Sequence, residues 1–417
     1  MLLAASGIDA QPAKGANKFL GNITTRNAVR SDFLTYWNQI TGENEHKWAS
    51  VEGTRDRMNW GGGDNIANFA KQNGITWKFH TLVWGSQYPS WMNSLSQADQ
   101  LKQITEWFDE TKKHYPDIPM IDVVNEAYEA NGGKHAPPPW KNALGGNGST
   151  GFDYIIKAFQ MARERWPKAI LIYNDYNNCE YGNEVNWTVK LMEAMKKAKA
   201  PVDAIGCQAH DAWKIPTATV KSNLDKLAAT GYPIFITEYD IGESNDAKQK
   251  QIMQEQFTMF WNHPKIVGIT YWGYLVGATW RNGTGLLNTS GSERPALTWL
   301  KEYVKNNPNP PNDFPNLLKN GGGLNTSAKE TIIKNQATQM RINQNGSLIN
   351  VTLQPNDNEQ VVLNVYDLKG KIVRSESLNA GSHTCSFNTS GMSNGYYVVK
   401  ALCGNSIQKA GFVLSGR

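Results

Sequence analysis

Eight short runs rich in β-branched and aromatic residues alternate with longer segments between residues 17 and 305. Apolar residues recur at helical spacing in the longer segments, as at Ile155, Phe159 and Ala162. Eight β/α units predict an α/β fold, a (β/α)8 TIM barrel. A doubly wound sheet normally has fewer strands, and it carries a glycine-rich first turn that this sequence lacks. The predicted strands cover residues 17–23, 39–45, 76–84, 120–127, 169–177, 204–210, 233–241 and 268–274.

The rest of the chain divides around this barrel. Residues 1–16 are interpreted as a leader or an expression remnant, and residues 306–329, rich in Pro, Gly and Asn, as an irregular linker. Residues 330–417 alternate apolar and polar residues between Gly, Asn and Ser turns, which predicts a small all-β sandwich. Cys385 and Cys403 fall on or beside its strands, and whether they pair stays open.

Composition limits the partners. The net charge of +5 is spread along the chain without a Lys/Arg block, so we expect no nucleic-acid partner. No run approaches the ~20 apolar residues of a membrane span, so we expect no membrane partner. With 40% hydrophobic residues the chain can bury a sizeable core. We expect a monomer.

Two predicted strands end in a glutamate, the fourth in Glu126 and the seventh in Glu238. A single glutamate at a strand end is more often a capping or surface residue. In a (β/α)8 barrel, however, the C-terminal strand ends meet at one face and build the active site. A pair of carboxyl groups is what most glycoside hydrolases use to cleave a glycosidic bond, so two glutamates at that face favour this chemistry.

Other polar and aromatic residues also follow the predicted strands. No two of the candidate ligands show the close helical spacing of a metallohydrolase motif, so we expect neither a metal ion nor a cofactor. Trp, Asn and Gln among them suit a polyhydroxylated ligand. These strand-end residues include Glu43, Asn44, Lys47, His80, Trp84, Gln87, Asn125, Tyr176, Gln208, His210, Asp240 and Trp272.

The runs ITGENEHKW, HTLVWGSQYPSW, DVVNEA, YNDYN, IGCQAH, ITEYDI and WGYLVGATWR, in this order, resemble glycoside hydrolase family 10, the endo-β-1,4-xylanases. The resemblance covers about residues 17–305 and every strand end. It implies hydrolysis of xylan and xylo-oligosaccharides with retention of anomeric configuration.

The resemblance also implies roles for individual residues. Glu126 matches the acid/base and Glu238 the nucleophile, with His210 and Asp240 supporting the nucleophile and Asn125 bonding the sugar 2-hydroxyl. The residues matched to substrate binding are Glu43, Asn44, Lys47, His80, Trp84, Gln87, Tyr176, Gln208, Trp272 and Trp280. Trp272 and Trp280 would form a wall that favours xylose over glucose.

Four positions depart from the family pattern: Phe79, Gly85, Tyr239 and Val276. Gly85 stands where the family usually has a histidine. We expect the missing imidazole to open space near the active centre and to affect substrate range and pH optimum.

The C-terminal module resembles sorting domains of the type IX secretion system, on the run NVYDLKGKIVRSESLNAGSHTCSFNTSGMSNGYYVVKAL. This implies a secreted or surface-attached protein. A carbohydrate-binding module is the alternative, with Tyr396 or Tyr397 on a binding face, although the absence of Trp favours sorting.

The leading hypothesis is therefore a secreted, retaining endo-1,4-β-xylanase. One alternative is a broader β-1,4-glycanase that also accepts mixed-linkage glucan or cellulose. Another is a polysaccharide-binding protein without catalysis.

Overall fold

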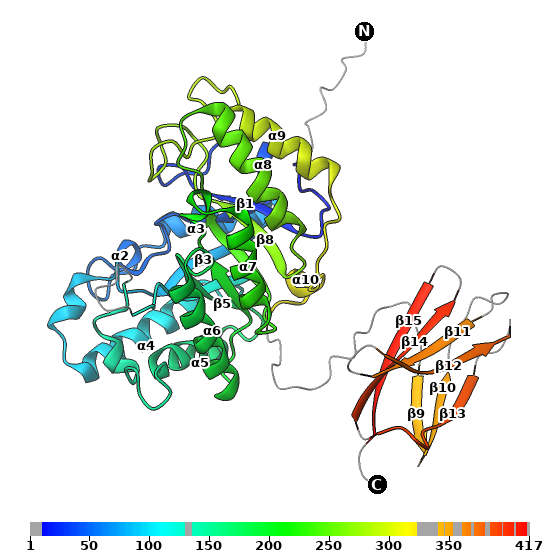
Figure 1. Cartoon of the computed structure of the whole chain (residues 1–417). Helices are drawn as coiled ribbons and strands as arrows, with labels where there is room; N and C mark the ends of the chain where they lie inside the picture. The colour runs from blue at the N-terminus through cyan, green and yellow to red at the C-terminus, as the bar shows by residue number, and fades with distance from the viewer. Residues whose placement is uncertain are drawn as a thin grey trace. The chain divides into compact units, whose positions relative to one another are not determined.

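The structure is a computed structural model. It describes residues 11–129 and 136–322, and in the C-terminal part residues 341–345, 347–352, 361–367, 371–379, 384–393, 395–403 and 406–414. The chain forms two compact units that meet in sequence between Lys329 and Glu330. Figure 1 colours the first from blue to yellow and the second from orange to red.

The first unit is a closed barrel of eight parallel strands in sequence order, with β1 paired to β8. Each predicted strand overlaps an observed one, so the predicted (β/α)8 fold is confirmed. The strands are β1 (Phe19–Ile23), β2 (Gln39–Thr41), β3 (Thr76–Val83), β4 (Met120–Asn125), β5 (Ile170–Asp175), β6 (Ala204–Cys207), β7 (Ile234–Tyr239) and β8 (Ile266–Tyr271).

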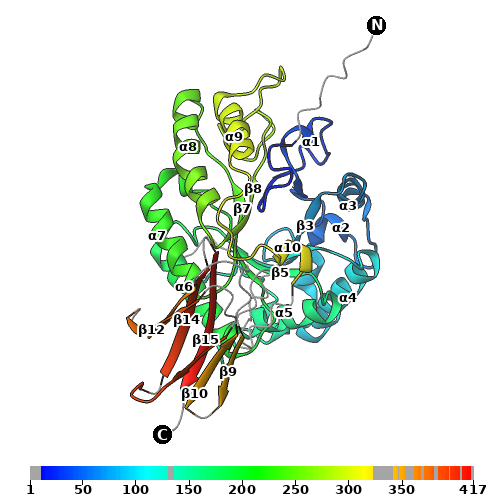
Figure 2. The same ribbon diagram turned by 90° about the vertical axis from the view of Figure 1, so that its right-hand side faces the viewer.

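Helices follow the strands and cover the barrel from outside, with α3 and α4 on the other side of the strands from α7 and α8 in Figure 2. The long helices are α3 (Gly61–Asn73), α4 (Gln97–His114), α5 (Asp153–Arg165), α6 (Gly182–Lys197), α7 (Thr217–Ala228), α8 (Asp246–Asn262) and α9 (Pro295–Asn306). The short ones are α1 (Phe33–Tyr36), α2 (Trp48–Val51) and α10 (Leu317–Asn320). No helix in the described part of the chain is long and apolar enough to cross a membrane.

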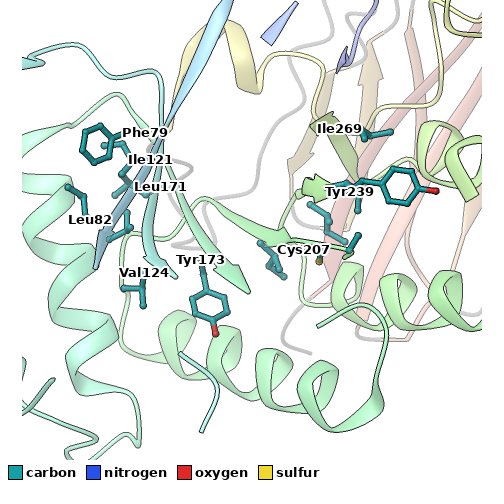
Figure 3. Packing of buried hydrophobic residues seen from close by; sticks show 14 of the residues in the cluster. Phe79, Leu82, Ile121, Val124, Leu171, Tyr173, Cys207, Tyr239 and Ile269 are labelled. Carbon is teal, nitrogen blue, oxygen red and sulfur yellow. The ribbon is translucent and has the colours of Figure 1, made fainter. Parts of the chain in front are cut away.

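The main core lies between the strands and the helices. Figure 3 shows Phe79 and Leu82 pointing outward from one side of the barrel and Tyr239 from another. Successive strand residues point to opposite faces, so one set packs on the helices while the alternate set fills the barrel. Phe79 and Tyr239, two of the departures from the family pattern, are both fully buried in this outer core.

The inside of the barrel is layered. Its N-terminal end is apolar, filled by a buried cluster that includes Phe19, Met120 and Phe235. Farther along the strands the fill becomes polar, with Gln39 Nε2 donating to Thr41 Oγ1 at 2.9 Å and Thr270 Oγ1 donating to Gln39 Oε1 at 2.8 Å. Polar side chains therefore lead up to the C-terminal strand ends.

The segment after α9 differs from the predicted linker. Asn17 Nδ2 donates to the Pro310 carbonyl at 2.8 Å, and the short helix α10 places Leu317 in the apolar cluster at the N-terminal end of the barrel. The many prolines of this segment argued against a helix. However, α10 begins after the last of them, Pro315, and ends before Gly321. Residues 323–329 of the predicted linker lie outside the described residues.

Residues 11–16 also differ from the expected remnant. Ala13 is 1% exposed, and its carbonyl accepts a hydrogen bond of 2.9 Å from Asn38 Nδ2. This part of the N-terminal segment packs on the barrel, while residues 1–10 lie outside the description.

The second unit is all-β, as predicted, with the described strands in two antiparallel sheets. Its own core includes Val351, Leu363 and Phe387. Cys385 is a free, half-buried thiol, whereas the side chain of Cys403 lies outside the description. The sheets contain β13 (Thr384–Asn388), β10 (Leu348–Thr352) and β9 (Arg341–Asn345), and β12 (Ile372–Leu378), β11 (Val361–Tyr366), β14 (Gly395–Cys403) and β15 (Ser406–Leu414).

Candidate active site

A cavity of about 490 Å³ lies at the C-terminal ends of the barrel strands. All the site residues expected from the sequence line it except Asn125 and Asp240, which are fully buried behind it. The lining residues are Glu43, Asn44, Lys47, His80, Trp84, Gln87, Glu126, Tyr176, Asn177, Gln208, His210, Asp211, Glu238, Trp272, Trp280 and Arg281.

Glu126 follows β4 directly and has a left-handed backbone, with φ at 56°. Such a conformation is unfavourable for a residue with a side chain, and it is common at functional sites. Trp84 Nε1 donates to Glu126 Oε2 at 3.0 Å, and Gln208 Nε2 donates to Oε1 at 3.1 Å. Burial raises the pKa of Glu126 to about 7, although these two hydrogen bonds oppose the shift. The group can therefore hold a proton near neutral pH.

Glu238 lies on β7 and has an opposite electrostatic environment. His210 Nε2 is 3.1 Å from Glu238 Oε2, and His210 Nδ1 is 3.0 Å from Asp240 Oδ2. Both partners are carboxylates, so both ring nitrogens can donate only when the imidazole is protonated. Burial opposes that charge, but Asp240 and Glu238 outweigh burial and raise the pKa of His210.

Burial alone would raise the pKa of Glu238. The hydrogen bond from His210 and the nearby cationic side chains outweigh burial, so the pKa of Glu238 lies well below its usual range. The pKa values of the two carboxyl groups in the cavity are thus shifted in opposite directions.

Asn174, at the end of β5, connects these two carboxyl groups. Its Nδ2 donates to Glu238 Oε1 and to Asn125 Oδ1, both at 2.8 Å. Asn125 Nδ2 in turn donates to Glu126 Oε1 at 3.3 Å. These bonds engage Asn125 Oδ1 and one of the two hydrogens on its Nδ2. Sequence reasoning gave Asn174 no role; its place inside the YNDYN run was the available signal.

An ion pair inside the barrel lies behind this site and was not predicted. Lys78 Nζ contacts Asp122 Oδ2, which is also 2.9 Å from His80 Nδ1, and all three side chains are almost completely buried. A buried charge is tolerated when it is paired and hydrogen bonded. The signal was a lysine and an aspartate interrupting two apolar strands.

Polar side chains line one part of the cavity as a linked group. Lys47 Nζ donates to Asn44 Oδ1 at 2.9 Å and to Gln87 Oε1 at 2.7 Å. The same ammonium lies 5.0 Å from the centroid of the Trp84 ring. Burial lowers the pKa of Lys47, while burial raises the pKa of nearby Glu43. These groups offer donors and acceptors fixed in position for hydroxyl groups.

Aromatic rings form another wall. Trp272 lies edge-on to His80 with ring centroids 5.5 Å apart, and Trp280, 52% exposed, lies 4.7 Å from His210. Arg281, which was not predicted, lies 4.5 Å from the Trp280 centroid and donates to the His210 carbonyl at 2.6 Å. Asn177 and Asp211 are the other lining residues that sequence reasoning missed.

The space expected at Gly85 is absent, which corrects that prediction. A Cβ there would lie 2.2 Å from the Ala136 carbonyl oxygen and 2.4 Å from that of Pro137. Backbone from the connection after β4 fills the position, and neither Gly85 nor Val276 lines the cavity.

Across the described residues, no three His, Cys, Asp or Glu side chains are grouped so as to hold a metal ion. A parallel (β/α)8 barrel with two carboxyl groups of opposed pKa at its strand ends defines a glycoside hydrolase that works with two carboxylates. Residues 2–303 match glycosyl hydrolase family 10. The chain belongs to this family, which is a family of retaining xylanases.

Relatives agree with this assignment. Endo-1,4-beta-xylanase B of Cellvibrio japonicus is 47% identical over 287 residues, covering 68% of this chain but only 45% of that protein. Endo-1,4-beta-xylanase 3 of Hypocrea jecorina is 30% identical over 305 residues, covering 70% of this chain and 84% of that protein. The crystal structure of xylanase 10B from Thermotoga petrophila in complex with xylobiose aligns with a TM-score of 0.64 and 26% identity, covering 74% of this chain and 100% of that one.

Residues 343–414 match the secretion system C-terminal sorting domain, which indicates that the protein is secreted. Tyr397 is 6% exposed and packs on Phe412 with ring centroids 5.5 Å apart. Its ring therefore belongs to the core of the module and offers no sugar-binding platform. The side chain of Tyr396 lies outside the description.

Proposed function

We propose that this chain is a secreted, retaining endo-1,4-β-xylanase in which Glu238 is the nucleophile and Glu126 the acid/base. The observation that carries the proposal is the opposed displacement of the two pKa values, raised at Glu126 and lowered at Glu238. A nucleophile must be ionised, whereas the general acid must begin protonated. The family membership supports the same division of roles.

In the first step, the Glu238 carboxylate attacks the anomeric carbon while Glu126 gives its proton to the departing glycosidic oxygen. In the second, the Glu126 carboxylate takes a proton from water, which attacks the same carbon and releases Glu238. Two inversions give net retention. His210 and Asp240 keep Glu238 charged. Asn125 and Asn174 hold the two carboxyl groups in position through hydrogen bonds.

Xylan and xylo-oligosaccharides are the proposed ligands. The linked amide and ammonium groups of Asn44, Lys47 and Gln87 would bond the distal sugar hydroxyls, together with Glu43. Trp272 and Trp280 would pack on the pyranose rings, with Trp84 and His80 nearer the cleavage point and Tyr176 on the leaving-group side. The xylobiose bound by the Thermotoga petrophila relative is a ligand of this class. We propose that the protein acts as a monomer.

Comparing substrates tests this function. We expect reducing-sugar release from xylan to exceed release from mixed-linkage β-glucan and cellulose, with the β-anomer as first product by NMR. Comparable rates on the three polymers would favour the broader glycanase, and affinity for xylan without product would favour a binding protein. The occupied position at Gly85 removes the feature that had suggested a broader range.

The pH dependence of kcat/KM follows from the same two groups. We expect kcat/KM on xylan to fall as pH rises through about 7, because Glu126 then loses the proton that it must donate. On the acid side, activity should persist until Glu238 is protonated, below the usual range of a glutamate. Gln208→Leu removes a hydrogen bond that favours the charged form of Glu126, so the pKa of Glu126 should rise. The alkaline limb of the variant's kcat/KM profile should therefore move to higher pH. A profile that stays flat through neutral pH would contradict the acid assignment.

A further inference from the structure

The connection that leaves β4 at Glu126 returns to the end of β3. It begins with the acid/base glutamate, and after residues outside the description it comes back at Ala136, whose carbonyl accepts the Gly85 amide at 2.8 Å. Gly85 directly follows Trp84, the residue whose indole donates to Glu126 at 3.0 Å. One connection therefore begins at Glu126 and contacts the residue that follows Trp84.

The returning segment is stiff and well anchored. Pro137, Pro138 and Pro139 have fixed φ angles, and a residue before proline is confined to extended backbone, so the Ala136 and Pro137 carbonyls have little freedom. The next residue, Trp140, is 1% exposed and packs edge-on to Trp48 with ring centroids 5.6 Å apart.

Beyond Trp140, Lys141 forms an ion pair with Glu129, which precedes the residues outside the description. Both described ends of the connection are thus tied to each other as well as to the barrel.

Only glycine fits where this segment meets β3. A Cβ on Gly85 would lie 2.2 Å from the Ala136 oxygen, 2.4 Å from the Pro137 oxygen and 2.6 Å from the Pro137 carbonyl carbon. Side-chain Cβ atoms do not approach backbone this closely, and these atoms cannot rotate away as a flexible side chain would. The glycine is required here by the close approach of two backbones.

We propose that Gly85 is a positioning residue for the acid/base. Because Gly85 has no side chain, the backbone of Ala136 and Pro137 can pack against it. This packing holds the neighbouring Trp84 where the indole N–H donates to Glu126. The inference rests on the proposed function. Its consequence is that a side chain at Gly85 impairs proton delivery to the leaving group more than it impairs nucleophilic attack.

Leaving-group dependence separates these two effects. For Gly85→Ala we expect kcat/KM on phenyl β-xylobioside and on xylan to fall about tenfold or more, with a change within about twofold on 2,4-dinitrophenyl β-xylobioside. The dinitrophenolate leaves without a proton. In the glycosylation step, which kcat/KM reports, xylan and the phenyl substrate therefore depend on the Glu126 proton and the dinitrophenyl substrate does not. Gly182→Ala is the matched control, since nothing lies within 4 Å of a Cβ there. Gly182→Ala should leave kcat/KM on both aryl xylobiosides unchanged.

The pH profile gives a second readout. The hydrogen bond from Trp84 lowers the pKa of Glu126, so weakening it in Gly85→Ala should move the alkaline limb of kcat/KM to higher pH. Pro137→Ala, which loosens the segment without adding an atom at residue 85, should shift both readouts in the same direction by less. It keeps the test open if Gly85→Ala does not fold.

Three outcomes distinguish the possibilities. A selective loss on the phenyl substrate with a shifted limb supports the inference. Equal losses on both substrates, or none in either variant, would overturn it while leaving the proposed function intact. An inactive wild-type protein on both substrates would instead reject the proposed function.

Discussion

Glu238→Ala is expected to lower kcat by at least about 10⁴-fold on every β-xyloside, activated aryl xylobiosides included. The variant lacks the carboxylate that forms the glycosyl-enzyme bond, and a good leaving group cannot replace it. His210 would remain with Asp240 alone, so the rest of the cavity stays assembled. Initial rates on xylan and on 2,4-dinitrophenyl β-xylobioside measure the effect.

Azide provides the control for Glu238→Ala. A small anion entering the space left by the carboxylate should restore cleavage of the activated substrate and give the α-xylosyl azide, whose configuration NMR reports. Glu193→Ala, an exposed glutamate on α6, should behave as wild type. Substantial unaided turnover in Glu238→Ala would show that another group is the nucleophile.

Glu126→Ala should produce a different pattern, because it removes the proton donor and keeps the nucleophile. We expect xylan hydrolysis to fall about 10²- to 10⁴-fold. Glycosylation by 2,4-dinitrophenyl β-xylobioside should stay fast, so one equivalent of phenolate appears in a burst before slow release of the sugar. Pre-steady-state absorbance measures that burst.

Azide also tests this variant. It should attack the trapped glycosyl-enzyme and give the β-xylosyl azide, since one more inversion at the same carbon restores the original configuration. Losses that are equal on activated and unactivated substrates would assign Glu126 to a structural role. The two glutamates therefore have distinguishable signatures in both rate and product configuration.

The barrel could be predicted because each strand is short, apolar and followed by a helical segment. Its polar strand ends were equally visible, which is why Glu126, Glu238 and His210 were found. The ion pair of Lys78 with Asp122 was not, since the two residues meet only in the register that places His80 opposite Asp122. A local pattern carries no information about which residues of two neighbouring strands stand opposite each other.

Long-range packing explains the wrong expectation at Gly85. The sequence shows a small residue where relatives carry a ring, and that alone suggests empty space. What fills the space is backbone about fifty residues later in the chain, brought there by tertiary contacts. The helix α10 was missed for a related reason, because its four residues form a helix only against the apolar end of the barrel.

The barrel interior is apolar around Leu317 and polar toward the C-terminal strand ends, so the two ends of the barrel can evolve separately. Substitutions among Phe19, Phe235 and Leu317 act on the stability of the fold, while substitutions around the cavity act on substrate specificity. Selection for stability and selection for substrate specificity can therefore act on different residues of one chain.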